Sequence, residues 1–256
     1  MYKEVKMNLK AATKYQIYDY IKSIRIFYLV VFLVIVFFGT IASVSSSGNF
    51  QGMGSIEWSA MIFLFVLGLN SFKETFLMML QNSTSRKMMF ISRLITIVIT
   101  SASMAVIDRI IVNLAILISN ANERFEIGGM YEMLFDKRAA SMNIVLLNLE
   151  AILITSMVYV AAIIAGYFIT TAYYRMNKLW KTVISIGLPS TFFVLLPLLD
   201  MAAFDGKVSA AIQKIIIFVF GGKTGNPYNL FLSCILFSAV GIGLSWLLIR
   251  KAVEKN

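Results

Sequence analysis

The sequence predicts an all-α membrane protein that crosses the bilayer with six helices, and three observations support this fold class. The mean hydropathy of the chain is +0.81, and 59% of its 256 residues are hydrophobic, above the roughly 45–50% of soluble domains. Only 14% of the residues are charged. Six apolar stretches are each long enough to cross a hydrocarbon layer of roughly 30 Å. We therefore expect one transmembrane domain over residues 1–256.

The expected spans follow these apolar stretches in order. They are residues 24–44, 56–80, 94–119, 143–169, 183–199 and 230–249. Pro189 and Pro197 fall inside the fifth span and should kink it, because proline cannot complete the helical hydrogen-bond ladder. An apolar run at residues 210–220 is too short to cross the bilayer. It predicts a re-entrant segment in the outer leaflet before the last span.

The basic residues set the expected orientation. Fifteen Lys and Arg lie in the two terminal segments and in the loops after the second and fourth spans, against six in the other loops. The positive-inside rule then places both termini in the cytoplasm of a multi-pass plasma-membrane protein. The formal net charge of +10 is spread over the ends of spans. This distribution favours the lipid bilayer, and not nucleic acid, as the partner of the basic residues.

The first 23 residues have the pattern of an amphipathic helix. Basic residues recur every three or four positions, at Lys3, Lys6, Lys10 and Lys14, which places them on one helical face. Apolar residues that include Leu9, Ala12 and Tyr20 lie on the other side. We expect an interfacial helix along the inner leaflet over residues 1–23, before the chain turns into the bilayer. A basic tail that only fixes the orientation is the alternative.

The chain lacks the residues that most catalytic and metal sites use. It has no His and a single Cys, Cys234, so we expect no metal site, no bound cofactor and no catalytic residue. Gly222, Lys223 and Thr224 resemble the end of a phosphate-binding loop, but Ile217 stands where that loop needs its first Gly. The chain therefore has no nucleotide site of its own. An intramembrane enzyme would depend on three acids, Asp108, Glu150 and Asp200.

A short basic segment at residues 81–93 links the second and third spans on the expected cytoplasmic side. Its centre combines basic and large apolar side chains: Ser85, Arg86, Lys87, Met88, Met89 and Phe90. A short helix that presents such residues is suited to docking in a groove on a partner protein. An ordinary positive-inside loop has the same composition, so these residues alone leave both interpretations open.

Residues 80–95 (LQNSTSRKMMFISRLI) resemble the cytoplasmic signature that links the second and third spans of ABC-2 type permeases. Ser85, Arg86, Lys87 and Phe90 match the core of that signature, while Ser83 replaces the usual Gly and Arg93 the common Lys. The amphipathic N-terminus, the six spans and the re-entrant segment extend the resemblance over the chain. Its small, Met- and Phe-rich sequence is similar to permeases of the phenol-soluble-modulin exporter type.

The resemblance implies a coupling helix at Ser85–Phe90 that receives force from cytosolic ABC ATPase subunits, on which ATP and Mg²⁺ are bound. It also implies a second permease copy, as a homodimer or heterodimer. The loop at residues 170–181 would be a smaller contact with the ATPase. Its Tyr173, Tyr174 and Trp180 are equally expected as anchors at the membrane interface.

Three ionisable residues lie inside the expected spans: Asp108, Arg109 and Glu150. Such groups usually pair or line a wet cavity. Counted from the ends of their spans, Arg109 and Glu150 reach similar depths, which predicts an ion pair between the third and fourth spans. Asp108 then needs another donor. A structural role for this pair and a role in transport both remain open.

Together these features predict the membrane subunit of an ATP-driven exporter of amphipathic or hydrophobic substrates, with peptides as the first candidate. A lateral cavity lined by Met and Phe could accept varied apolar surfaces. Lipids, lantibiotics and hydrophobic drugs fit the same residues. The alternatives are an intramembrane enzyme and a non-enzymatic immunity or assembly factor.

Overall fold

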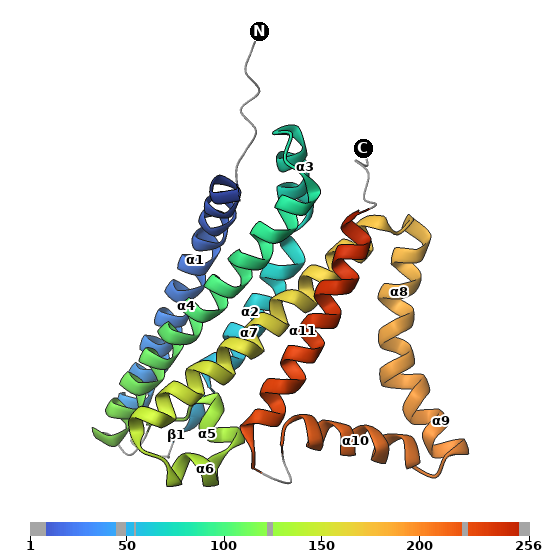
Figure 1. Cartoon of the computed structure of the whole chain (residues 1–256). Coiled ribbons are helices and arrows are strands. Elements are labelled where there is room, and N and C mark those ends of the chain that lie inside the picture. Colours follow the sequence, from blue (N-terminus) through green and yellow to red (C-terminus); the bar gives the residue numbers. More distant parts are fainter. Residues whose placement is uncertain (1–8, 45–49, 54, 122–124, 222–224, 251–256) are drawn as a thin grey trace.

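The structure is a computed structural model, and it describes residues 9–44, 50–53, 55–121, 125–221 and 225–250. It is built almost entirely from helices, as Figure 1 shows. In the described residues, five helices are long and apolar enough to cross a membrane, and a sixth span is formed if the bent pair α2–α3 counts as one. The prediction of an all-α protein with six candidate spans is confirmed.

The long elements correspond in order to the expected spans. They are α1 (Leu9–Val44), α2 (Ile56–Asn70) with α3 (Lys73–Gln81), α4 (Arg86–Ala121), α7 (Ile144–Arg175), α8 (Lys178–Ser190) with the π-helical turn η1 (Thr191–Leu195) and α9 (Leu196–Ala203), and α11 (Pro227–Arg250). The short elements are β1 (Phe50–Met53), β2 (Phe125–Ile127), α5 (Met130–Leu134), α6 (Asp136–Ser141) and α10 (Lys207–Val219). The two strands pair in parallel.

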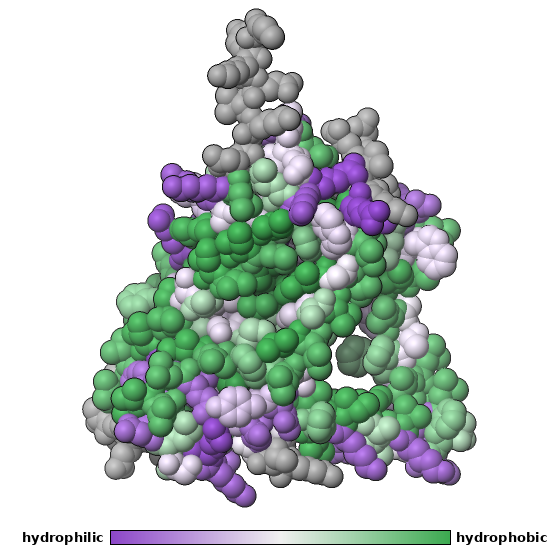
Figure 2. Space-filling view, in the orientation of Figure 1, coloured by the Kyte–Doolittle hydropathy of each residue, from purple (hydrophilic) through white to green (hydrophobic). Residues whose placement is uncertain are grey.

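The surface separates polar from apolar residues along the long axis of the helices. In Figure 2 hydrophilic residues gather at the two ends of the molecule, and a broad hydrophobic belt lies between them. The start of α1, the turn between α3 and α4 and the end of α11 lie at one end, at the top of Figure 1. This is the arrangement expected for a protein whose long helices cross a bilayer.

The predicted turn between an interfacial helix and the first span is wrong for the described residues. Residues 9–44 form one unbroken helix, α1, which is about 54 Å long at about 1.5 Å per residue. One face of its first turns is covered by protein, because Ala12, Gln16 and Tyr20 are buried against residues of α2, α3 and α4. Lys10 and Lys14 remain exposed. Residues 1–8 lie outside the described residues.

The second span is broken near its predicted cytoplasmic end. Helices α2 and α3 meet at an angle of 41°, and Ser71 and Phe72 form the break. The hydroxyl and the backbone N–H of Ser71 both return to the Gly68 carbonyl, at 2.7 and 3.3 Å. The break redirects α3 outward, so that α3 and the start of α4 project from the molecule as a hairpin (Figure 1).

Helix α7 is the centre of the bundle and packs against α2, α4 and α11. Two glycines allow α2 and α7 to approach closely. A Cβ atom on Gly68 would lie 2.4 Å from the Ile163 carbonyl oxygen, and one on Gly166 would lie 2.2 Å from the Phe65 carbonyl oxygen. Small residues of this kind are how membrane helices bring their backbones into contact.

The fifth span stands apart from the rest of the chain. It runs through α8, η1 and α9, and no residue of α8 or η1 is buried. The predicted irregularity is present as the π-helical turn, which lies between Pro189 and Pro197. Helix α10, at the site of the predicted re-entrant segment, lies across the ends of the neighbouring spans and does not run down between them (Figure 1).

Candidate functional site

The first candidate site is the elbow, which we define as α3, the turn at residues 82–85 and the first two turns of α4. Ser83 has φ = 54°, a left-handed conformation that glycine adopts most easily. The Ser85 hydroxyl accepts a hydrogen bond from the Met88 backbone N–H at 3.2 Å, which caps α4. The predicted coupling helix is therefore not a separate helix. It is the start of the 36-residue α4.

Two of the residues expected to face a partner instead pack inside the chain. Met89 and Phe90 are 6% and 7% exposed, and the rings of Phe90 and Trp246 lie 5.2 Å apart. Ser85 and Lys87 are exposed, and Arg86 and Met88 are half-buried. One guanidinium nitrogen of Arg86, Nη1, donates to the Arg250 carbonyl at 2.9 Å. The accessible part of the elbow is thus polar and basic, and its apolar residues fix it to α11.

The aromatic residues of the predicted loop at residues 170–181, which the structure places in the last turn of α7 and the first turn of α8, separate into two groups. Tyr174 packs on the rings of Phe72 and Phe76, with centroids 5.3 and 5.6 Å away. It therefore holds the start of α3, and with it the elbow, against α7. Tyr173 shares a hydrogen bond of 2.9 Å with Ser185, and Trp180 is 58% exposed.

The second candidate site is a buried polar network among α4, α5 and α7. Arg109 is 2% exposed. Its Nη2 atom lies 2.6 Å from Glu132 Oε1 of α5, and its Nε donates to Asn148 Oδ1 of α7 at 2.6 Å. The Asn113 amide also donates to Asn148 Oδ1, at 3.1 Å.

The predicted Arg109–Glu150 ion pair is wrong. Glu150 instead accepts two hydrogen bonds from Arg138 of α6, at 3.0 and 3.2 Å. The physical reason is that the segment between the third and fourth spans folds back onto the bundle as α5 and α6. Glu132 of α5 thereby reaches Arg109 of α4, and Arg138 of α6 reaches Glu150 of α7. The hydrogen bonds that Arg138 donates to Glu150 hold the pKa of the guanidinium above its usual value.

The donor that Asp108 was expected to need is supplied by two tyrosines. Tyr28 of α1 donates to one oxygen at 2.8 Å and Tyr159 of α7 to the other at 2.5 Å. Asp108 is fully buried. Both donors are neutral, and Asp108 has no ion pair within the described residues. Its hydrogen bonds join α1, α4 and α7 at one point.

Glu57 is a buried acid that sequence analysis missed. It lies at the start of α2, is 1% exposed, and accepts hydrogen bonds from Ser55, Thr155 and the Met130 backbone N–H. It is close enough to Arg109, Glu132 and Asp108 for their charges to interact. The signal was an acidic residue at the second position of an expected span. The network thus combines three carboxyl groups with one guanidinium.

The third candidate site is a lateral cavity of about 590 Å³ between α2, α7 and α11. Its walls are almost entirely apolar, and α7 contributes the small side chains of Ala161, Ala162 and Ala165. Larger side chains on the other elements complete it: Trp58, Met61, Phe65, Met130, Phe220 and Phe237. The cavity has the size of a small-molecule or acyl-chain site.

The three acids considered for an enzyme lie in different surroundings. Asp200 accepts hydrogen bonds from the backbone N–H groups of Val208 and Ser209, both at 2.8 Å, and so caps α10. Asp108 is held by tyrosines and Glu150 by Arg138. No group of three or more metal-ligating side chains occurs among the described residues.

Comparison with protein-family models, with curated proteins and with solved structures gives no match. The class of protein therefore follows from the fold and its surface. The chain is a helical multi-span membrane protein in contact with the lipid bilayer.

Proposed function

We propose that this protein is the membrane-spanning subunit of an ATP-driven ABC exporter of amphipathic or hydrophobic substrates. The observation that carries the proposal is the elbow. It is a helical hairpin that projects from the predicted cytoplasmic end (Figure 1), and its second helix continues without a break into a span. A chain whose sequence predicts no nucleotide site of its own needs such a contact to receive energy from a partner.

The local geometry of the elbow supports the resemblance to ABC-2 type permeases. Ser83 stands where those proteins carry Gly, and its φ of 54° is the conformation that explains a preference for Gly there. Ser85 and Lys87 are exposed at the tip. A polar, basic tip on a rigid support suits docking against an acidic groove of a cytosolic ATPase.

The lateral cavity supports the substrate class. Its Met and Phe side chains present a large apolar surface beside the membrane, and Met adapts to partners of different shape. Amphipathic peptides are the first candidate, and lipids or hydrophobic drugs fit the same walls. Replacing Ala162 with Phe should fill the cavity and lower export without removing a polar contact.

The exposed fifth span supports a second permease copy. No residue of α8 or η1 is buried, and most of their apolar residues are exposed, including Leu179, Ile186 and Phe193. A span that touches so little of its own chain is available to pack against a partner in the bilayer.

The elbow can be tested by charge reversal. Lys87→Glu should reduce the ATPase activity that co-purifies with the affinity-tagged full chain by roughly tenfold. The substitution replaces a positive charge with a negative one, which an acidic groove on the ATPase would repel. Lys137→Glu is the matched control, since Lys137 is also exposed but lies in α6 at the other end of the molecule. The proposal fails if no ATPase accompanies the wild-type chain, or if both variants retain it equally.

A further inference from the structure

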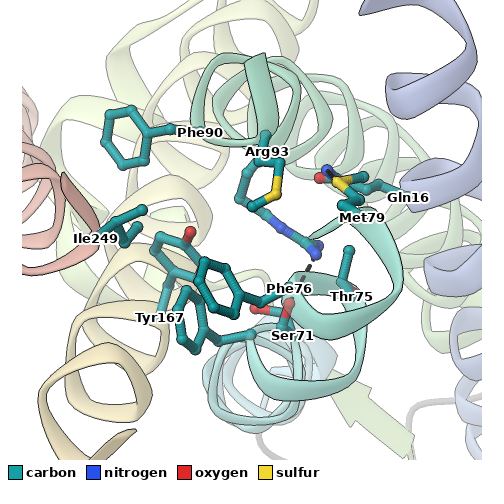
Figure 3. Close-up of a pocket in the computed structure, with 11 residues that line it drawn as sticks. Gln16, Ser71, Thr75, Phe76, Met79, Phe90, Arg93, Tyr167 and Ile249 are labelled. Atoms are coloured by element: carbon teal, nitrogen blue, oxygen red, sulfur yellow. Dashed lines mark hydrogen bonds between the residues drawn. The ribbon is translucent and has the colours of Figure 1, made fainter. Parts of the chain in front are cut away.

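A small cavity lies beneath the elbow, and the guanidinium of Arg93 points into it (Figure 3). The cavity has a volume of about 20 Å³, which is room for about one water-sized group. Five helices contribute to its walls: Gln16 of α1, Thr75 and Met79 of α3, Phe90 of α4, Tyr167 of α7 and Ile249 of α11. Movement of any of these helices would change its shape.

Arg93 is buried without a counter-ion in the part of the chain that the structure describes. It is 2% exposed, and its Nη2 atom donates to the Ser71 carbonyl at 2.7 Å. The guanidinium carbon lies 5.2 Å from the ring centre of Tyr20 and 6.0 Å from that of Tyr167. These contacts are with neutral groups, and Nη1 has no hydrogen-bond partner. A buried charge in this state is costly unless an anion reaches it.

We propose that the cavity binds an anionic oxygen of a phosphate group, with Arg93 Nη1 as its donor. Arginine is the side chain best suited to phosphate, because its planar donors match the oxygens of the anion. The volume admits one oxygen, so the rest of the group stays at the mouth. The site lies at the end of the bundle where basic residues gather and lipid headgroups are expected. The phosphate comes from a phospholipid headgroup or from free phosphate.

The site is placed to act on the elbow. Arg93 bonds to the carbonyl of Ser71, which is one of the two residues at the break between α2 and α3. An anion on Nη1 holds the guanidinium in the orientation that makes this bond. The bound phosphate therefore stabilises the angle at which α3 leaves the membrane. This inference does not depend on what the elbow contacts.

The test uses the purified full chain in dodecyl maltoside, which is uncharged and contains no phosphate. The melting temperature is measured during titration with a short-chain phosphatidylglycerol, with a diacylglycerol of the same chains, and with inorganic phosphate. Phosphatidylglycerol should raise the melting temperature and diacylglycerol should not. A rise with inorganic phosphate as well identifies free phosphate as a ligand, and no such rise identifies the lipid headgroup.

Two variants and one control connect the effect to this cavity. Arg93→Gln should weaken the apparent affinity by roughly tenfold or more, the loss expected for one charged hydrogen bond. Lys87→Gln removes the same charge from the exposed tip and should leave the affinity unchanged. Gln16→Glu places a carboxylate on the cavity wall, where Gln16 Oε1 has no partner. It should raise the melting temperature without lipid and remove most of the lipid effect.

Three results would overturn the assignment. The wild-type chain could respond to neither phosphatidylglycerol nor phosphate, in which case a single water fills the cavity. Arg93→Gln could respond like the wild type, which would place the binding site elsewhere. If Arg93→Gln does not fold, a full lipid response in Gln16→Glu decides against the proposal by itself.

Discussion

Neutralising Glu132 should destabilise the protein through Arg109. In Glu132→Gln the guanidinium keeps its hydrogen bond to Asn148 but loses the carboxylate 2.6 Å away. Breaking a fully buried pair costs about 3–5 kcal/mol. The Glu132 side chain is 24% exposed, so water offsets part of this loss and we expect about 2–3 kcal/mol. For a chain of this size that lowers the melting temperature by about 4–12 °C, at about 2–4 °C per kcal/mol.

The assay is a double-mutant cycle on the detergent-solubilised chain, with Arg109→Met as the second substitution. Residues in direct contact give coupling energies of about 0.5–3 kcal/mol, and distant ones add within about 0.5 kcal/mol. Arg109 and Glu132 should couple. Arg109 and Glu150 should not, because Glu150 is bonded to Arg138. Coupling of Arg109 to Glu150, with additive effects for Glu132, would refute this account of the network.

Three further predictions follow from the packing and the surface. Gly166→Ala should lower the free energy of unfolding by about 1–3 kcal/mol, because the added Cβ forces α7 away from α2. Gly187→Ala, whose Cβ meets nothing within 4 Å, should leave thermal unfolding nearly unchanged. Equal effects of the two substitutions would contradict the close approach of α2 and α7. Phe90→Ala should lower stability by about 3–5 kcal/mol, and an unchanged melting temperature would show that Phe90 is not in the core. In a background without the native cysteine, an impermeant thiol reagent applied to intact cells should label Ser141→Cys but not Ser85→Cys, and the reverse pattern would invert the orientation.

Hydropathy was sufficient to locate the spans, because long apolar runs have few alternatives in a bilayer. It could not define what happens at their ends. The N-terminal pattern of Ala12 and Tyr20 was recognised, but the surface that covers it is protein and not lipid. Part of that surface belongs to α3, whose direction follows from the break at Ser71, and a local break of this kind leaves little trace in an apolar sequence.

The candidate site was less accessible to sequence analysis. Asp108, Arg109 and Glu150 were correctly singled out as buried charges. Their partners were not predicted correctly. The depth of a residue along its span does not show whether a connecting segment folds back onto the bundle, and Glu132 and Arg138 both come from such a segment. Arg93 was interpreted as a basic residue of a loop and as the counterpart of the common Lys in the resembled signature. Its burial depends on Tyr20 and Tyr167, which are distant in the sequence.

The unbroken helix α4 connects the elbow directly to the polar network, because it contains both the start of the elbow's second helix and Arg109. No proline or glycine interrupts its 36 residues, so the helix should bend little. Arg109 lies 23 residues beyond Arg86, or about 35 Å along the axis. Tilting this rod by about 5° at the elbow shifts Arg109 by about 3 Å, more than the 2.6 Å that now separates it from Glu132. A small rotation at one end of α4 would therefore be enough to open an ion pair about 35 Å away along the same helix.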